Sequence, residues 1–481
     1  MKSAVFILFA HIKSLIRRYA NTVSARIDTS RPTPTEADIE VFYVVTIVSL
    51  RALDLGYYRF IYSRMALEMS LPIANVAQLP FKERGHVLCG TGASVVFINA
   101  VKTLFGVGLF SVPWVFYKSG WMVATMCVCF AVALSLEAFR MLTRAQDLLI
   151  TDCKVPRQDV TTYMALAERA LGSFGYAWCC LAITIACFGI TVSYIRFVVD
   201  TCSNICPELS SLLLYMFVAP LFCLLSLVRK VSTLTVVSTT GSVSVVLCIA
   251  VTILQASQRG LSFTPLAIVS DAIFECISPV AFIFFVHFTL FDVQTAVPDS
   301  ATFLSSVRAA YVTGAIIVSI FGLVTSMAFG DTSFIIITAL SGIAGTMTKV
   351  LMSLNIIFSY PIMARPALQI FEKSSAGNAV GPKSITRTRI LFTLAAILVA
   401  ALVPDFRVAL AIVGGVFACT LSLIFPPVIL LSAYFKVNER VSVGEWLRIL
   451  AVLTTGVWCI FTSFYSFGVP VEVGISSGVK G

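Results

Sequence analysis

The sequence predicts an all-α polytopic membrane protein with about eleven transmembrane helices, and three observations support this fold class. Of the 481 residues, 58% are hydrophobic and 12% are charged, whereas soluble domains have about 45–50% apolar and about 25% charged residues. The apolar residues form long continuous runs. Such runs exclude a single membrane anchor and also a β-barrel, whose segments are short and alternating. Glycine and proline inside the runs are typical of helices with breaks.

Residues 1–88 are less apolar than the rest of the chain. Met1–Ala10 is apolar, but His11 and Lys13 follow without a clean small-residue cleavage site. A signal peptide is therefore weakly indicated, and an interfacial amphipathic segment fits equally well. Thr29–Asp38 is rich in threonine and proline and is interpreted as a linker. We expect residues 1–88 to form a cytosolic N-terminal extension that is partly disordered.

From residue 91 onward, apolar runs recur at about the 20 residues that one crossing requires. The expected spans are 91–117, 121–142, 174–198, 210–228, 233–256, 267–291, 307–330, 341–364, 387–404, 408–432 and 446–468. We accordingly divide the rest of the chain into three parts. These are 89–264 with spans 1 to 5, 265–432 with spans 6 to 10, and 433–481 with span 11 and a short tail.

The distribution of lysine and arginine predicts the orientation of these spans. If the N-terminus is cytosolic, the loops on the inner side carry most of the basic residues, as the positive-inside rule requires. The outer side then carries only Lys118, Arg196, Arg259, Arg407 and Lys480. The net charge of +10 is explained by this topology, so the lipid bilayer is the expected partner and no nucleic acid is needed.

Two spans contain residues that interrupt helices near their centres. In span 1, Gly106 and Gly108 lie two apart and Pro113 follows, and in span 6, Ser278 precedes Pro279. Transporters with inverted repeats place their binding site at such paired breaks. Because the two spans are five apart, two repeats of five helices plus one extra helix account for all eleven. The alternative is that the glycines only permit close packing and the proline only kinks its helix.

At these residues the sequence resembles the amino acid/auxin permease family. Residues 97–121, with Gly106, Gly108 and Pro113, are similar to its first-helix motif. The stretches 162–175, 328–331 and 359–366 resemble its segments before helix three and at the ends of helices seven and eight. The resemblance covers about residues 85–435. It implies the leucine-transporter-like fold, with a five-plus-five inverted repeat and broken helices 1 and 6, and cation-coupled amino acid transport.

A free amino acid carries a carboxylate and an ammonium group, and both need partners inside a membrane. Unwound helices provide them, because freed N–H groups bind the carboxylate and freed carbonyl groups bind the ammonium. Glycine lets the ligand approach the backbone closely. The substrate site is therefore predicted at Phe105, Gly106, Val107 and Gly108, with Val280, Ala281 and Phe282 opposite. The apolar wall favours neutral substrates.

Lys102 lies one turn before the predicted break in span 1. The resemblance is informative here, because sodium-coupled neutral amino acid transporters of the family have asparagine at the Lys102 position and threonine at the position of Ser359. Two positive charges about 4 Å apart repel each other by roughly 4 kcal/mol at an effective dielectric constant of about 20. A charged Lys102 should exclude sodium, and burial disfavours the charged form, which leaves H⁺ as the expected coupling ion. Vacuolar-type members resemble this sequence at the same position.

Three other polar positions within the spans were considered. His287 matches a histidine in helix six of the neutral amino acid transporters and is expected either to relay protons or to serve as a hydrogen-bonded structural residue. Lys349 is expected either to be functional or to extend toward the outer interface. Glu137 and Arg140 are close enough in sequence to pair. Cys202 and Cys206 share a loop and are interpreted as free thiols, with a disulfide as the alternative.

The function predicted first is a secondary active, H⁺-coupled symporter of neutral amino acids. Alternatives are a Na⁺-coupled or uncoupled exchanger on the same fold, and an amino acid sensor that does not transport. The sequence has no His-rich metal cluster, Gly-x-Ser-x-Gly motif or phosphate-binding loop, so neither an enzyme nor a cofactor is expected. The expected location is the plasma membrane or the vacuolar or lysosomal membrane.

Overall fold

The computed structural model describes residues 81–228, 231–260, 272–297, 299–330, 333–374, 382–403 and 406–468. The chain divides into two compact units, Met1–Ser70 and Leu71–Gly481, and all described residues belong to the second. The predictions for Met1–Ala10 and Thr29–Asp38 lie outside the described residues. The account below therefore concerns the helical part of the chain.

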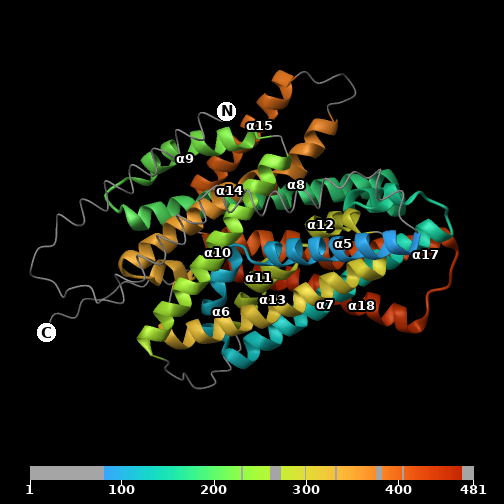
Figure 1. Ribbon diagram of the computed structural model, residues 1–481, viewed down its shortest axis with the longest axis horizontal. Helices are drawn as coiled ribbons and strands as arrows, with labels where there is room; N and C mark the ends of the chain where they lie inside the picture. The colour runs from blue at the N-terminus through green and yellow to red at the C-terminus, as the bar shows by residue number, and fades with distance from the viewer. Residues whose placement is uncertain are drawn as a thin grey trace, which may run out of the picture. The chain divides into compact units, whose positions relative to one another are not determined.

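Each of the eleven expected spans corresponds to helix in the described part (Figure 1). Spans 1 to 5 are α5 (Phe81–Leu104) with η1 (Val107–Ser111) and α6 (Val112–Ser119), α7 (Trp121–Thr151), α8 (Tyr163–Ile205), α9 (Ser211–Ser226) and α10 (Val231–Arg259). Spans 6 to 10 are α11 (Ala272–Phe284) with α12 (His287–Leu290), α13 (Ser300–Phe329), α14 (Gly342–Ser374), α15 (Pro382–Leu402), and α16 (Phe406–Leu410) with η6 (Ala411–Ala418), η7 (Thr420–Ile424) and α17 (Phe425–Val437). Span 11 is α18 (Val443–Gly468), and the short helices η2 (Arg157–Val160), η3 (Phe291–Ala296) and η4 (Ile336–Ala339) lie between spans.

The lengths and apolar character of these helices fit a membrane protein. Among the described residues, eight helices are long and apolar enough to cross a membrane, and span 1 qualifies when its two bent halves are counted together. Spans 4 and 5 contain shorter apolar helices, Ser211–Ser226 and Val243–Arg259. The described residues include no strand. The predicted class of an all-α polytopic membrane protein is therefore confirmed.

Helices five apart in the chain pack against each other. Span 1 contacts span 6 through η1, α6 and α11, and span 2 contacts span 7 through α7 and α13. Spans 3 and 8 (α8 and α14) and spans 4 and 9 (α9 and α15) form the next two pairs. Successive spans cross in alternate directions, so helices five apart run in opposite directions. This pairing fits the predicted five-plus-five inverted repeat, and the fold class is confirmed.

Span 10 is wound as π-helix over η6 and η7, a form that is rare and concentrated at functional sites. Its glycines let span 6 approach closely, because a Cβ atom on Gly414 would lie 2.5 Å from the backbone oxygen of Ser278. A Cβ atom on Gly415 would overlap the hydroxyl of Ser463 in span 11. Spans 6, 10 and 11 are thus in direct contact around Ser278.

Candidate functional site

Span 1 breaks where the sequence predicts it. The helix α5 ends at Leu104, and the axis turns by 44° between Gly92–Leu104 and Val107–Ser119. Gly106 has φ −101° and ψ −161°, an extended conformation that any residue can adopt. Its glycine identity is therefore not required by its backbone angles.

The break exposes backbone donors. The N–H of Phe105 still bonds to the carbonyl of Val101 at 3.1 Å, and the N–H of Leu109 bonds to the carbonyl of Gly106 at 3.2 Å. Between them, the N–H groups of Gly106, Val107 and Gly108 form no backbone hydrogen bond with any described residue. Unpaired N–H groups at the start of a helix are suited to binding an anionic group.

The two glycines at this break have different surroundings. A Cβ atom on Gly106 would meet nothing within 4 Å. A Cβ atom on Gly108 would lie 2.8 Å from Cδ1 of Phe282 and 3.0 Å from Cγ1 of Ile283. Gly108 therefore allows spans 1 and 6 to pack closely, whereas Gly106 leaves open space.

Span 6 breaks later than the sequence predicts. Its helix α11 continues through Ser278 and Pro279 and ends at Phe284, so the expected break at those two residues is wrong. A proline removes only one N–H donor, and the helix continues here because span 10 and span 11 pack against it, with the hydroxyls of Ser278 and Ser463 3.1 Å apart. The break lies at residues 285–286, before α12 begins at His287.

Neighbouring side chains satisfy the backbone at this second break. The carbonyl of Phe284 accepts hydrogen bonds from the hydroxyl of Tyr311 at 2.8 Å and the hydroxyl of Ser135 at 3.2 Å. His287 is fully buried, and its Nε2 donates to the carbonyl of Ser135 at 2.9 Å. Its ring stacks on Phe139 with centroids 4.1 Å apart. These contacts hold span 6 against spans 2 and 7.

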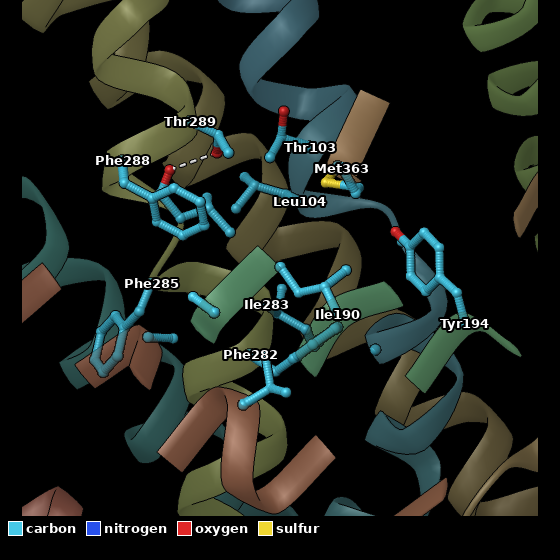
Figure 2. A pocket seen from close by; sticks show the side chains of 16 residues that line it. Thr103, Leu104, Ile190, Tyr194, Phe282, Ile283, Phe285, Phe288, Thr289 and Met363 are labelled. Atoms are coloured by element: carbon cyan, nitrogen blue, oxygen red, sulfur yellow. Dashed lines mark hydrogen bonds between the residues drawn. The ribbon is translucent and has the colours of Figure 1, made fainter. Parts of the chain in front are cut away.

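A pocket lies between the two breaks (Figure 2). Five spans contribute to its wall, namely spans 1, 3, 6, 8 and 10. Its lining residues are Thr103, Leu104, Gly106, Gly108, Ala186, Ile190, Tyr194, Phe282, Ile283, Phe285, Val286, Phe288, Thr289, Met363, Val413 and Ala418. Within the described part of the chain, this wall is apolar and aromatic and includes no charged side chain.

The predicted substrate-binding residues are distributed around this pocket. Gly106, Gly108 and Phe282 line it. Phe105 lies half-buried beside the break, while the other three, Val107, Val280 and Ala281, are buried outside the lining. Sequence reasoning missed the contributions of spans 3, 8 and 10, which depend on helix packing. The polar Tyr194 within an apolar helix was the one available signal.

The residues predicted for ion coupling lie near the pocket without lining it. Lys102 is half-buried in the last turn of α5, next to the lining residue Thr103. The hydroxyl of Ser359 donates to Oδ1 of Asn355 at 3.5 Å, and Met363 one turn later lines the pocket. His287 points to span 2 through Ser135. No hydrogen bond among the described residues joins Lys102, Ser359 and His287 to one another.

Charged residues elsewhere in the spans have structural contacts. Lys349 donates to Oδ1 of Asn204 at 3.0 Å, which links span 8 to the end of span 3. The predicted pair of Glu137 and Arg140 is confirmed at 2.7 Å, and Arg140 also reaches Glu445 of span 11 at 2.7 Å. Sequence reasoning missed this second partner, which is distant in the chain.

The two loop cysteines that the sequence interprets as free thiols, Cys202 and Cys206, are both free in this structure. Cys206 is exposed at the end of α8, between spans 3 and 4. It is thus a suitable site for chemical labelling of the loop that follows span 3.

Comparisons with known proteins agree with this picture. Residues 90–469 match the family model described as transmembrane amino acid transporter protein. The chain is 23% identical over 398 residues to the amino acid transporter AVT3B of Arabidopsis thaliana, covering 77% of this chain and 93% of that one. The transporter AVT3A of the same organism is 23% identical over 382 residues, covering 75% and 87%.

Two solved structures are similar at lower identity. The manganese transporter of Eremococcus coleocola is 12% identical, with a TM-score of 0.48, covering 79% of this chain and 88% of that one. MhsT in complex with L-phenylalanine is 14% identical, with a TM-score of 0.43, covering 77% and 98%.

Proposed function

The chain belongs to the transmembrane amino acid transporter family, and from this premise we propose that it is a secondary active transporter that moves neutral amino acids together with H⁺. The substrate would bind in the pocket between the breaks in spans 1 and 6. The observation that carries the proposal is the unpaired backbone at Gly106 and Gly108, which borders this pocket.

The chemistry of the pocket supports a neutral substrate. The N–H groups at the break in span 1 would bind the substrate carboxylate, and carbonyl groups freed at the same break would bind its ammonium. A charged substrate side chain would then need a further partner, because burying an unpaired charge is strongly unfavourable. The described lining provides no charged side chain for this purpose. Uncharged amino acids therefore fit the pocket better than acidic or basic ones.

Lys102 supports H⁺ as the coupling ion. Its ammonium group makes no hydrogen bond or ion pair with another described residue, so no carboxylate neutralises it there. A sodium ion about 4 Å away would experience a repulsion of roughly 4 kcal/mol at an effective dielectric constant of about 20. In the proposed cycle Lys102 takes up and releases the proton. Ser359 provides a hydroxyl at the position where the sodium-coupled relatives have threonine.

Proteoliposomes with imposed ion gradients would test the coupling. We expect an inward pH gradient to drive accumulation of a labelled neutral amino acid in the absence of sodium. The variant Lys102→Met should lose this accumulation, whereas the control Lys349→Met removes another membrane lysine and should keep it. Sodium-driven accumulation without a pH gradient would exclude H⁺ coupling, and exchange without any accumulation would identify an uncoupled exchanger. Binding of amino acids without either activity would identify a sensor.

We further propose a cytosolic N-terminus and the repeat boundaries 89–264 and 265–432, with the protein in the plasma membrane or the vacuolar or lysosomal membrane. Two exposed cysteines allow the orientation to be tested. Cys153 follows span 2 on the predicted inner side, and Cys206 follows span 3 on the predicted outer side. A membrane-impermeant thiol reagent applied to the outer side should label a variant that retains only Cys206. If the reagent instead labels the variant that retains only Cys153, then the orientation is opposite to the proposed one.

A further inference from the structure

Four of the buried tyrosine hydroxyls in the described part of the chain donate a hydrogen bond to a protein acceptor. The hydroxyls of Tyr163, Tyr215 and Tyr311 donate to backbone carbonyl groups at 2.5, 2.8 and 2.8 Å, and that of Tyr360 donates to Oγ1 of Thr393 at 2.9 Å. Tyr194 differs from these four. Its side chain is buried, with 6% exposure, yet its hydroxyl makes no hydrogen bond with any described residue. The hydroxyl oxygen is not one of the fully buried unpaired atoms of the described residues, so it retains accessible surface and faces open space.

Tyr194 lines the pocket between the two breaks. Figure 2 shows its ring at one wall, with the hydroxyl end turned toward the side of Leu104 and Met363. Leu104 is the last residue of α5 before the break in span 1. The hydroxyl is therefore presented to the same space as the unpaired N–H groups of that break.

The other two hydroxyl side chains of the lining are already used. Thr103 donates to the carbonyl of Asn99 at 2.7 Å, and Thr289 donates to the carbonyl of Val286 at 2.8 Å. Both bonds lie within the residue's own helical segment. Among the described lining residues, Tyr194 is thus the side chain with a hydroxyl donor still available to a ligand.

We propose that Tyr194 positions the substrate by donating a hydrogen bond to its carboxylate. This inference rests on the proposed function, since it assigns a second donor to the same site. A carboxylate has two oxygens that accept several hydrogen bonds, and bonds to a charged acceptor are stronger than neutral ones. The N–H groups at the break in span 1 and the hydroxyl of Tyr194 would then bind the same carboxylate.

The variant Tyr194→Phe tests the inference, with Tyr360→Phe as its matched control. Removing a hydroxyl without a protein partner should leave the melting temperature of the substrate-free protein unchanged. It should raise the KM for a neutral amino acid by about tenfold or more, as expected for the loss of a bond to a charged group, and leave kcat unchanged. Tyr360→Phe removes a buried hydrogen bond to Thr393, and Tyr360 does not line the pocket, so it should lower the melting temperature and leave KM unchanged.

A substrate analogue identifies the group that the hydroxyl contacts. An amino alcohol that lacks the carboxylate should inhibit uptake weakly, and equally in the wild type and in Tyr194→Phe. If Tyr194→Phe weakens inhibition by the amino alcohol as much as it raises the KM for the amino acid, then the carboxylate is not the acceptor. An unchanged KM in Tyr194→Phe would overturn the inference. The proposed function would still stand in that case, provided that the wild type takes up neutral amino acids. Absence of amino acid binding and uptake in the wild type would instead refute the proposed function.

Discussion

The two helix breaks that meet at the pocket are built in opposite ways. In span 1, the N–H groups of Gly106 and Gly108 have no backbone partner within the described ranges, and Gly106 faces open space. In span 6, the carbonyl of Phe284 accepts two side-chain hydrogen bonds, and His287 is anchored to the backbone of Ser135. A helix break therefore does not by itself make a binding site. Under the proposed function, the break with unsatisfied backbone would bind the ligand, and the satisfied break would hold the wall of the pocket in place.

The largest effect should come from filling the open space at the first break. In Gly106→Val, the backbone angles are acceptable for valine and the new Cβ meets no protein atom within 4 Å. The variant should fold, because its backbone angles are acceptable and its Cβ atom has open space. Its side chain would occupy the place where we expect the substrate, so uptake and substrate binding should be abolished.

The control for this experiment is Gly444→Val. Gly444 is exposed near the start of α18, and a Cβ atom there also meets nothing within 4 Å. It should leave uptake and the melting temperature unchanged. Normal uptake by Gly106→Val would show that the substrate does not bind at the break in span 1, and the contrast between the two breaks would lose its functional meaning.

The second largest effect should come from removing the partners of the satisfied break. The double variant Ser135→Ala with Tyr311→Phe leaves the buried carbonyl of Phe284 without its two side-chain donors. Leaving such a group unsatisfied should cost about 2–3 kcal/mol. The measurement is thermal unfolding in detergent, with each single variant showing part of the decrease. An unchanged melting temperature would mean that water or the membrane environment satisfies this carbonyl equally well.

A smaller effect is expected at Gly108, the glycine that allows spans 1 and 6 to pack closely. In Gly108→Ala, the added methyl would lie 2.8 Å from the ring of Phe282 and 3.0 Å from Ile283. Both side chains line the pocket, so overpacking should cost about 1–2 kcal/mol of stability and also weaken substrate binding. The measurements are the melting temperature and KM. A loss of binding at full stability would place Gly108, like Gly106, among residues that contact the substrate.

The sequence predicts the spans well because membrane crossing depends on local length and apolarity. It also predicts the first break, where two glycines lie two apart. It misplaces the second break, because the consequence of Pro279 depends on its neighbours. Gly414 of span 10 and Ser463 of span 11 pack at this level and keep α11 helical. The actual break at residues 285–286 has no glycine or proline to reveal it.

The pocket itself shows a similar limit of sequence reasoning. Residues near the break of span 1 are predictable, because a broken helix necessarily exposes its own backbone. Ile190 and Tyr194 come from span 3 and Val413 from span 10, and only the packing of five spans brings them together. A tyrosine in an apolar helix does not reveal whether its hydroxyl is paired, as the contrast between Tyr194 and Tyr311 illustrates.

The smallest effect is expected at His287. A variant at this position distinguishes a structural role of this side chain in span 6 from a role in ion coupling. A glutamine at this position can still donate to the carbonyl of Ser135, but it loses the stacking on Phe139. His287→Gln should therefore cost about 1 kcal/mol of stability and keep uptake driven by a pH gradient, unlike Lys102→Met. Proteoliposome uptake measured beside the melting temperature would decide the issue. If the variant melts like the wild type but no longer responds to the pH gradient, then the proton is carried at the second break, by a residue whose Nδ1 is buried without a partner among the described residues.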